Sequence, residues 1–249
     1  MPLQIYADLE SLSMAAADLF VAKAKKAIID HNRFCVALSG GLTPMRTFEI
    51  LAQKQWQKKM PWNDTHVFWS DERFVPENNV LRNSLMAAKA LLDHVPVPLE
   101  QVYKFNCNLS PKESAEQYDS LLHSYFSKHQ YFDLLMLGLG AEGHAASIFP
   151  GSTAIEEHER WVTSVNLPGQ ELQRITLTLP IINRSACILF LVAGAEKAGI
   201  LKEVLEPKHG KPGLPAQLVC PKYKNAEIYW MVDKAAALLL KNVELAHIH

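Results

Sequence analysis

The strongest constraint on the fold is an alternation of two kinds of segment along the chain. Short apolar runs rich in strand formers alternate with longer segments whose apolar residues have helical spacing. The apolar runs cover residues 34–38, 66–69, 132–137, 175–179, 187–192 and 228–232. The helical segments cover roughly residues 9–31, 44–57, 79–94, 111–130, 196–205 and 233–243.

This alternation predicts an α/β fold. Runs that are apolar on both faces are typical of parallel strands covered by helices. We therefore expect an open, doubly wound, mostly parallel sheet with helices on both faces, of the Rossmann-like kind. The chain has no repeat, no low-complexity tract and no Gly/Ser-rich linker, and PVPLEQV and KPGLPAQ are interpreted as internal loops. A single domain over residues 1–249 is expected.

Composition narrows the class of protein. The formal net charge is −1 and no basic block occurs, which argues against a nucleic-acid partner. Four cysteines lie far apart and form no C-x-x-C pair, which favours reduced thiols over a zinc site: Cys35, Cys107, Cys187 and Cys220. The N-terminal residues lack a secretory pattern, and the longest apolar run, ACILFLVAGA, is about half a membrane span. A soluble cytoplasmic protein without a membrane partner is expected.

Functional groups follow the predicted strands. Ligands of open α/β sheets bind beyond the carboxyl ends of the strands, where the strand order reverses. Successive strands are followed by SGGLTP, SDERF, GLGAEGHAAS and AGAEK, and QRITLTLP places Arg174 just ahead of its own strand. We therefore expect these segments to meet at one edge of the sheet.

The segment ALSGGLTP resembles a phosphate cradle. Gly40 and Gly41 allow the backbone to approach a ligand, Ser39 and Thr43 add hydroxyl donors, and a proline can start a helix whose N–H groups favour an anion. The Walker motif is absent, because no Gly-Lys-Ser/Thr follows. The alternative is a tight strand-to-helix turn with Thr43 as a cap.

Three cations are candidates for binding an anion. Arg73 in VFWSDERFVPENN could bind a phosphate or carboxylate, with Asp71 or Glu72 holding it or orienting a sugar hydroxyl. The alternative is a structural ion pair at a strand end. Arg174 and Lys197, each more often a solvated surface charge when taken alone, would complete with Arg73 a cleft suited to a dianionic phosphate.

The segment GLGAEGHAASIFPG matches G-x-G-x-x-G, but its context argues against a nicotinamide cofactor. Pro150 comes seven residues after Gly143 and leaves barely two turns for the long helix that a dinucleotide fold needs. A dinucleotide fold also needs an acid at the end of its second strand. Here the next acids, at residues 156–160, come before the next plausible strand, WVTSV.

What remains in this segment is a histidine with a nearby carboxylate. His144 has the side chain whose ordinary pKa suits a general base near neutral pH, and Glu142 could fix its tautomer. Ser147 is not a nucleophile elbow, since G-x-S-x-G is absent. The chain contains no H-E-x-x-H or H-x-x-x-H pattern, so no metal is expected.

Taken in order, these segments resemble the 6-phosphogluconolactonases of the pentose phosphate pathway, whose superfamily includes the glucosamine-6-phosphate isomerases (deaminases). The resemblance covers nearly the whole chain, through ALSGGLTP, VFWSDERFVP, LLMLGLGAEGHAASIFPG, RITLTLPIINRSACILFLVAGAEKA and YWMVDKAAA. The deaminases typically carry a tyrosine after the Asp-Glu pair and a glutamate in a stretch like GHIAFNEP. This chain has Arg73 and GHAASIFPG there, which favours the lactonase. One departure is Glu142, where the lactonase pattern usually has aspartate.

The resemblance implies hydrolysis of 6-phosphoglucono-δ-lactone without metal or cofactor, by a monomer or small homo-oligomer. His144 would be the general base, with Glu142 and Asp71 as further catalytic residues. Residues expected to bind the phosphate are Ser39, Gly40, Gly41, Thr43, Arg73, Arg174 and Lys197. Two alternatives remain: an isomerase of the same superfamily, and a sugar-phosphate sensor. A sensor would need a DNA-binding head, for which one domain leaves no room, and would have no reason to keep His144.

Overall fold

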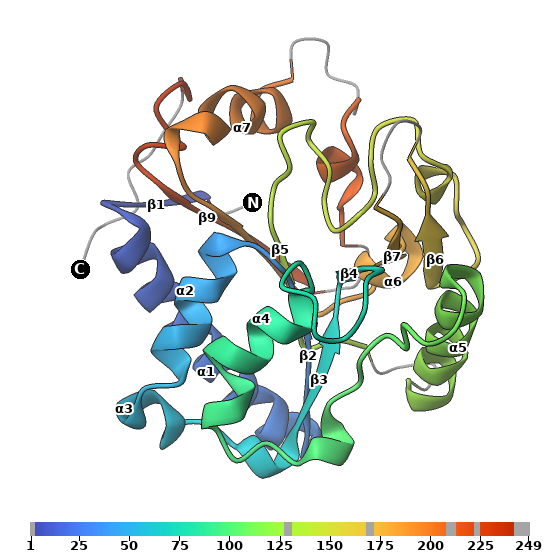
Figure 1. Cartoon of the computed structure of the whole chain (residues 1–249). Helices are drawn as coiled ribbons and strands as arrows, with labels where there is room; N and C mark the ends of the chain where they lie inside the picture. Colours follow the sequence, from blue (N-terminus) through green and yellow to red (C-terminus); the bar gives the residue numbers. More distant parts are fainter. Residues whose placement is uncertain (1–2, 127–130, 168–171, 208–212, 222–224, 242–249) are drawn as a thin grey trace.

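The computed structural model describes residues 3–126, 131–167, 172–207, 213–221 and 225–241. Its centre is a six-stranded sheet in the order β1-β9-β8-β5-β2-β3, in which every neighbouring pair is parallel (Figure 1). The strands are β1 (Leu3–Tyr6), β2 (Phe34–Leu38), β3 (Thr65–Trp69), β5 (Leu134–Leu137), β8 (Cys187–Val192) and β9 (Glu227–Asp233). The prediction of a mostly parallel α/β fold is confirmed.

The middle strands are buried on both faces. Every residue of β2, β5 and β8 is buried, which is why their sequences read as unbroken apolar runs. The ring of Phe190 in β8 stacks on Trp230 in β9, with centroids 3.9 Å apart. Burial of these runs makes the sheet the centre of one contiguous hydrophobic core.

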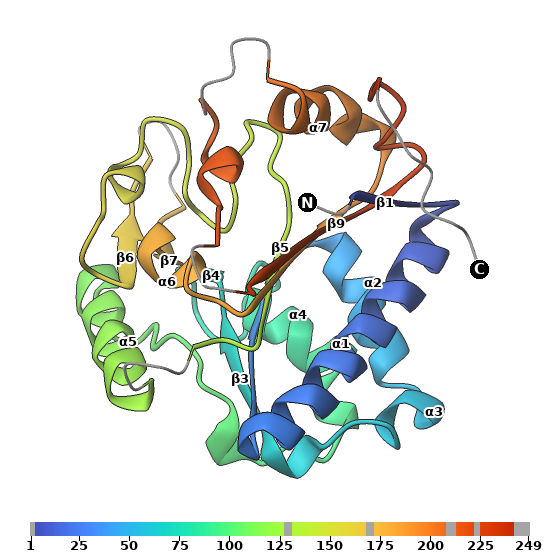
Figure 2. The same ribbon diagram turned by 180° about the vertical axis from the view of Figure 1, so that it is seen from behind.

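Helices cover both sides of this sheet. The long helices are α1 (Leu9–His31), α2 (Leu42–Leu51), α4 (Asn83–Ala90), α5 (Pro111–Tyr125) and α7 (Ala198–Leu205), and the short ones are α3 (Lys54–Gln57) and α6 (Leu179–Ile182). The 3-10 turns are Trp62–Asp64, Leu92–His94, Leu99–Gln101, Thr153–Ile155, Ala195–Lys197 and Pro215–Leu218. Figures 1 and 2 show α1, α2 and α4 on one side of the sheet and α5 on the other. Within the described ranges, no helix combines the length and apolarity of a membrane span.

Local sequence explains where the two longest helices begin. The side chain of Asp8 accepts a hydrogen bond from the backbone N–H of Ser11, and the Ser11 hydroxyl oxygen accepts one from the backbone N–H of Asp8, a capping box for α1. Ser110 and Glu113 make the same reciprocal pair at the start of α5. The helix predicted at residues 9–31 therefore agrees with α1. Residues 127–130 of the helix predicted at 111–130 lie outside the described ranges.

A second, antiparallel sheet corrects one prediction. It has the order β4-β7-β6, with β4 (Asp71–Arg73), β7 (Arg174–Leu177) and β6 (Val162–Val165). The run at residues 175–179 was expected in the parallel sheet, but it pairs antiparallel with β4 and β6 and ends where α6 begins. Thr176 and Thr178 are buried like the apolar residue between them, so this run resembles the runs of the parallel sheet, which are also buried on both faces. Arg174 is the first residue of the strand and does not precede it.

The C-terminal segment corrects another prediction. A helix was expected over residues 233–243, but Asp233 ends β9 and the described residues that follow, up to 241, form turns. The Asp233 carboxylate accepts hydrogen bonds from the N–H groups of Gly194 and Ala236, which bends the chain at this point. Leu238 and Leu239 are exposed, so the apolar spacing does not correspond to a buried helical face. Residues 242 and 243 lie outside the described ranges.

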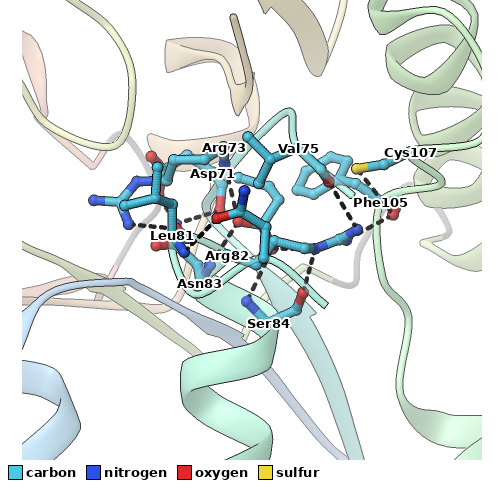
Figure 3. Close-up of polar contacts among 11 residues, drawn as sticks. Asp71, Arg73, Val75, Leu81, Arg82, Asn83, Ser84, Phe105 and Cys107 are labelled. Carbon is cyan, nitrogen blue, oxygen red and sulfur yellow. Dashed lines mark hydrogen bonds and ion pairs between the residues drawn. The ribbon is translucent and has the colours of Figure 1, made fainter. Parts of the chain in front are cut away.

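The start of α4 is tied to β4 by a buried carboxylate. Glu72 accepts hydrogen bonds from the backbone N–H groups of Asn83 and Ser84, at 2.6 and 2.9 Å, which stabilises the first turn of α4. Its Oε2 also lies 3.5 Å from Nε of Arg82, and both side chains are about 1% exposed. The Arg82 guanidinium also donates hydrogen bonds to the Ser84 hydroxyl and to the Phe105 carbonyl (Figure 3).

Replacing Glu72 by alanine should destabilise the protein by about 3–5 kcal/mol, because Arg82 would be left as an uncompensated buried charge. Urea unfolding followed by circular dichroism measures this change. Glu10→Ala is the control, since Glu10 pairs with Arg46 at a half-exposed site and such pairs contribute little. Equal losses in the two variants would contradict the assigned role of Glu72.

Candidate active site

The site lies where the strand order reverses. The chain passes from β2 to β3 on one side, and the next parallel strand, β5, lies on the other side of β2. The loops that leave β2 and β5 therefore diverge, and such a divergence opens a crevice at the carboxyl ends of the strands. A cleft of about 730 Å³ occupies this position.

All the residues predicted for the site line this one cleft. They come from the loop after β2, from β4 and β7, from the loop after β5 and from the turn after β8. They are Ser39, Gly40, Gly41, Thr43, Asp71, Arg73, Glu142, His144, Arg174 and Lys197. The sequence argument thus identified the members of the cleft, whereas their chemical roles remain predictions.

The loop after β2 leaves backbone donors free at the start of α2. Gly41 is the N-cap with φ 107°, a conformation that favours glycine, and no side chain caps the helix. The first backbone bond runs from N–H of Met45 to O of Gly41, and no partner is described for the N–H groups of Leu42 and Thr43. The helix begins at Leu42, so the expectation that Pro44 starts it is wrong, and Thr43 is not its cap. Free N–H groups at a helix start favour a bound anion.

Asp71 and Glu72, which the sequence could not separate, have different roles. Asp71 lines the cleft, and its Oδ2 accepts a hydrogen bond of 2.7 Å from the Ser147 hydroxyl. The Asn83 amide donates to Oδ1 of Asp71 at 3.2 Å and to its backbone carbonyl at 2.9 Å (Figure 3). Glu72 turns away to the start of α4. Of the two carboxylates, Asp71 is therefore the one that lines the cleft.

Arg73 and Arg174 are directly opposite each other in the pairing of β4 with β7. Like charges at such positions destabilise a sheet unless something between them compensates. The buried Nε of each has no hydrogen-bond partner, and in the described part of the chain neither guanidinium forms an ion pair. Burial lowers the pKa of Arg174, as does Arg73, whereas Asp71 raises it. Nη1 of Arg73 donates a hydrogen bond of 2.9 Å to the carbonyl of Leu81. The alternative of a structural ion pair for Arg73 is not observed among the described residues.

Lys197 completes the set of cations. It ends the 3-10 turn Ala195–Lys197, which follows β8 through Gly194 with φ 101°. Both oxygens of Asp233 accept the N–H of Gly194, at 3.1 and 3.2 Å, and so hold this turn. Lys197 also contributes to the lowered pKa of Glu142, whose main cause is a hydrogen bond to its own backbone. The turn therefore brings a cation to the side of the cleft that carries His144.

His144 is oriented by its own loop. Its Nδ1 lies 3.0 Å from Oε2 of Glu142, so a proton on Nδ1 is donated to the carboxylate and Nε2 is left with a lone pair. A Cβ at Gly140 would lie within 2.0–2.4 Å of atoms of the imidazole ring, which shows how closely the backbone approaches it. Burial is the largest influence on the pKa of His144 and lowers it; Glu142 and Asp71 raise it, and Arg174 lowers it. Burial therefore favours the neutral form of the imidazole.

The rest of this loop differs from a dinucleotide-binding turn. Turns, not a helix, follow Gly143, so the G-x-G-x-x-G segment does not form the helix start that binds a dinucleotide pyrophosphate. The run WVTSV does contain a strand, β6. Among residues with described positions, no three His, Cys, Asp or Glu side chains gather closely enough to hold a metal ion.

Sequence reasoning missed the supporting polar residues Asn83, Ser147 and Asp233. Asp233 directly follows the strand predicted at residues 228–232, so the criterion that identified Asp71 could have found it. Asn83 and Ser147 carried no comparable signal, since each acts through a contact with Asp71 that only the folded chain creates.

Comparison with known proteins gives consistent relatives. The family described as glucosamine-6-phosphate isomerases/6-phosphogluconolactonase matches residues 7–230. A curated 6-phosphogluconolactonase from Nostoc sp. is 34% identical over 238 residues, 94% of this chain and 95% of that protein. One from Synechocystis sp. is 37% identical over 216 residues, 85% of this chain and 86% of that protein.

Solved structures agree with these relatives. The crystal structure of 6-phosphogluconolactonase from Thermotoga maritima is 30% identical, with a TM-score of 0.79, and covers 94% of this chain and 100% of its own. The enzyme of the same name from Trypanosoma brucei is 26% identical, with a TM-score of 0.83, over 96% and 98% of the two chains. A monomeric glucosamine-6-phosphate deaminase, 20% identical with a TM-score of 0.79 over 96% and 100%, shows the shared fold.

The anion site can be tested at Gly40. A Cβ there would lie 1.8 Å from Oδ1 of Asn83, so Gly40→Ala should displace Asn83 and the loop before α2. Inorganic phosphate should raise the thermal midpoint of the wild type, because a ligand that binds only the folded state stabilises it. The rise should be lost in Gly40→Ala and kept in Gly199→Ala, where a Cβ meets nothing. An unchanged rise in Gly40→Ala would contradict the site.

Proposed function

The chain belongs to the family of glucosamine-6-phosphate isomerases and 6-phosphogluconolactonases, and we propose that it hydrolyses 6-phosphoglucono-δ-lactone to 6-phosphogluconate. One observation carries the proposal: an imidazole oriented by Glu142 shares its cleft with a helix start and with two arginines for which no ion-pair partner occurs among the described residues. This combination suits an activated ester that carries a phosphate. Arg73, and the absence of an acid between His144 and Pro150, favour this activity over isomerisation.

His144 acts as the general base. Glu142 holds the proton on Nδ1, so Nε2 takes a proton from a water molecule as that water attacks the lactone carbonyl. The tetrahedral intermediate collapses, the bond from the carbonyl carbon to the ring oxygen breaks, and the imidazolium returns its proton to that oxygen. No covalent nucleophile is needed, because a lactone is already an activated ester.

Binding and charge stabilisation are assigned to the remaining groups of the cleft. Residues 39–43, Arg73, Arg174 and Lys197 anchor the phosphate and the charge that develops on the carbonyl oxygen. Asp71 keeps Ser147 and Asn83 in place and supplies a negative charge that supports the imidazolium.

The biological setting follows from the same features. We infer that the chain works in the cytoplasm as a monomer or small homo-oligomer, with no nucleic-acid partner. The net charge of −1 and the four free thiols support this setting.

His144→Ala should lower kcat by about 10²–10⁴-fold and change KM little, because a base acts in the transition state and not in substrate binding. The assay uses freshly generated 6-phosphogluconolactone, with spontaneous hydrolysis subtracted. His123→Ala is the control: this histidine stacks on Trp161 outside the cleft, and its loss should leave kcat unchanged. A folded His144→Ala with wild-type kcat would exclude the assigned base.

The pH dependence of kcat reports the same residue. The base must be neutral, so activity falls as the pH decreases through the pKa of His144; since burial lowers this pKa, the fall should lie below about pH 6.5. Glu142→Gln keeps a hydrogen-bond acceptor but removes a charge that raises the pKa. The acid limb of its profile, measured between about pH 4.5 and 7.5, should move to lower pH. Movement to higher pH would contradict the pairing.

A further inference from the structure

The ring of Phe149 contacts two groups that the proposed mechanism uses. Its centroid is 4.0 Å from that of the His144 imidazole, with 39° between the ring planes. Cζ of Arg174 lies 5.3 Å from the same centroid, within cation–π range. Phe149 is buried and lies behind the cleft without lining it. One side chain outside the cleft therefore supports both the assigned base and a cation.

A tight turn brings Phe149 back to His144. Ala145 and Ile148 form an isolated antiparallel bridge, and the N–H of Ile148 donates to the carbonyl of Ala145 at 3.0 Å. Ala146, inside the turn, has φ 50°, which reverses the chain direction. His144 directly precedes the bridged pair and Phe149 directly follows it, so the turn brings the two rings together.

The turn is anchored independently of the imidazole. The Ser147 hydroxyl donates to Oδ2 of Asp71 at 2.7 Å, and the Ser147 N–H donates to Oγ1 of Thr176 at 3.1 Å. These two partners lie on β4 and β7, in the small sheet. The position of Phe149 is therefore fixed by that sheet, and the ring in turn limits how the imidazole can move.

The ring also contributes to the environment of the imidazole. The charged groups that act on His144 are Glu142 on its own loop, Asp71 on β4 and Arg174 on β7. Burial outweighs them and lowers the pKa of His144. Phe149 is an aromatic neighbour of the imidazole and excludes water from the part that it covers.

We propose that Phe149 is a positioning residue for lactone hydrolysis: its ring holds the His144 imidazole and the Arg174 guanidinium in a fixed mutual arrangement. This inference rests on the proposed function. An aromatic ring suits the role because its face accepts both an imidazole and a guanidinium. An aliphatic side chain of smaller size fills less of the space and provides no such face.

Phe149→Leu tests the proposal by two measurements. The pKa of His144 is followed by a proton–carbon NMR titration, with the signal assigned by its loss in His144→Ala. It should rise toward the ordinary value of about 6.5, because water reaches the imidazole. In the lactonase assay, kcat should fall by about 10- to 10²-fold, because the His144 imidazole is displaced from its reactive position. KM should rise, because the Arg174 guanidinium loses its contact with the ring.

Phe20→Leu is the matched control. Phe20 is a buried ring of α1 that packs edge-on against Phe34, with centroids 5.3 Å apart, and it does not line the cleft. Its loss should lower the thermal midpoint without changing the pKa of His144, kcat or KM. If Phe149→Leu behaves like Phe20→Leu, Phe149 only fills the core and the proposal is wrong. If Phe149→Leu does not fold, Phe149→Met, closer in volume, undergoes the same two measurements.

The two measurements also separate this proposal from the function on which it rests. The NMR titration needs no turnover. A wild type without lactonase activity whose His144 pKa rises in Phe149→Leu would refute the function and leave the positioning role. An active wild type whose His144 pKa and KM do not respond to Phe149→Leu would refute the positioning role and leave the function.

Discussion

The hydrogen bond from Ser147 to Asp71 is the contact on which the arrangement of the cleft depends. It joins the loop after β5 to β4, and the N–H of Ser147 adds a bond to Thr176 of β7. A further bond, from the N–H of Ala216 to the carbonyl of Gly143, ties the start of the loop to the 3-10 turn Pro215–Leu218. Because the small sheet carries the arginines, the contact between Ser147 and Asp71 fixes the distance between the imidazole and the cations. Asp71 thus acts through geometry as well as charge.

The same small sheet holds charge that opposes folding. Arg73 and Arg174 face each other across β4 and β7, and among the described residues their buried Nε atoms have no hydrogen-bond partner. Selection for stability alone would favour an acidic residue at one of these positions, because like charges opposite each other in a sheet lower the free energy of unfolding. The large apolar core offsets this cost. A bound phosphate would remove the repulsion, so the free energy withheld from folding becomes available for binding.

Some features follow from the sequence because they depend on local pattern. The continuous apolar runs of β2 and β8 and the helical spacing of apolar residues in α1 predict these elements correctly, and polar residues after the strands mark the cleft. Other features depend on contacts between distant segments. Residues 175–179 form a mostly buried run like the others, and only their pairing with β4 and β6 shows that the strand is antiparallel. The different roles of Asp71 and Glu72 arise from Ser147 and from the start of α4, which adjacent sequence does not reveal.

Glu142 shows how the loop tolerates a longer acid. The lactonase pattern usually has aspartate at this position, and an added methylene could have moved the carboxylate away from the imidazole. In the structure the Glu142 side chain is 59% exposed, and it still brings Oε2 within 3.0 Å of Nδ1 of His144. The longer chain therefore reaches the same atom from a more solvated position. Solvent weakens its electrostatic effect on the imidazole, so its main contribution is to fix the tautomer. Burial of the imidazole therefore has a larger influence on the pKa of His144 than the Glu142 carboxylate has.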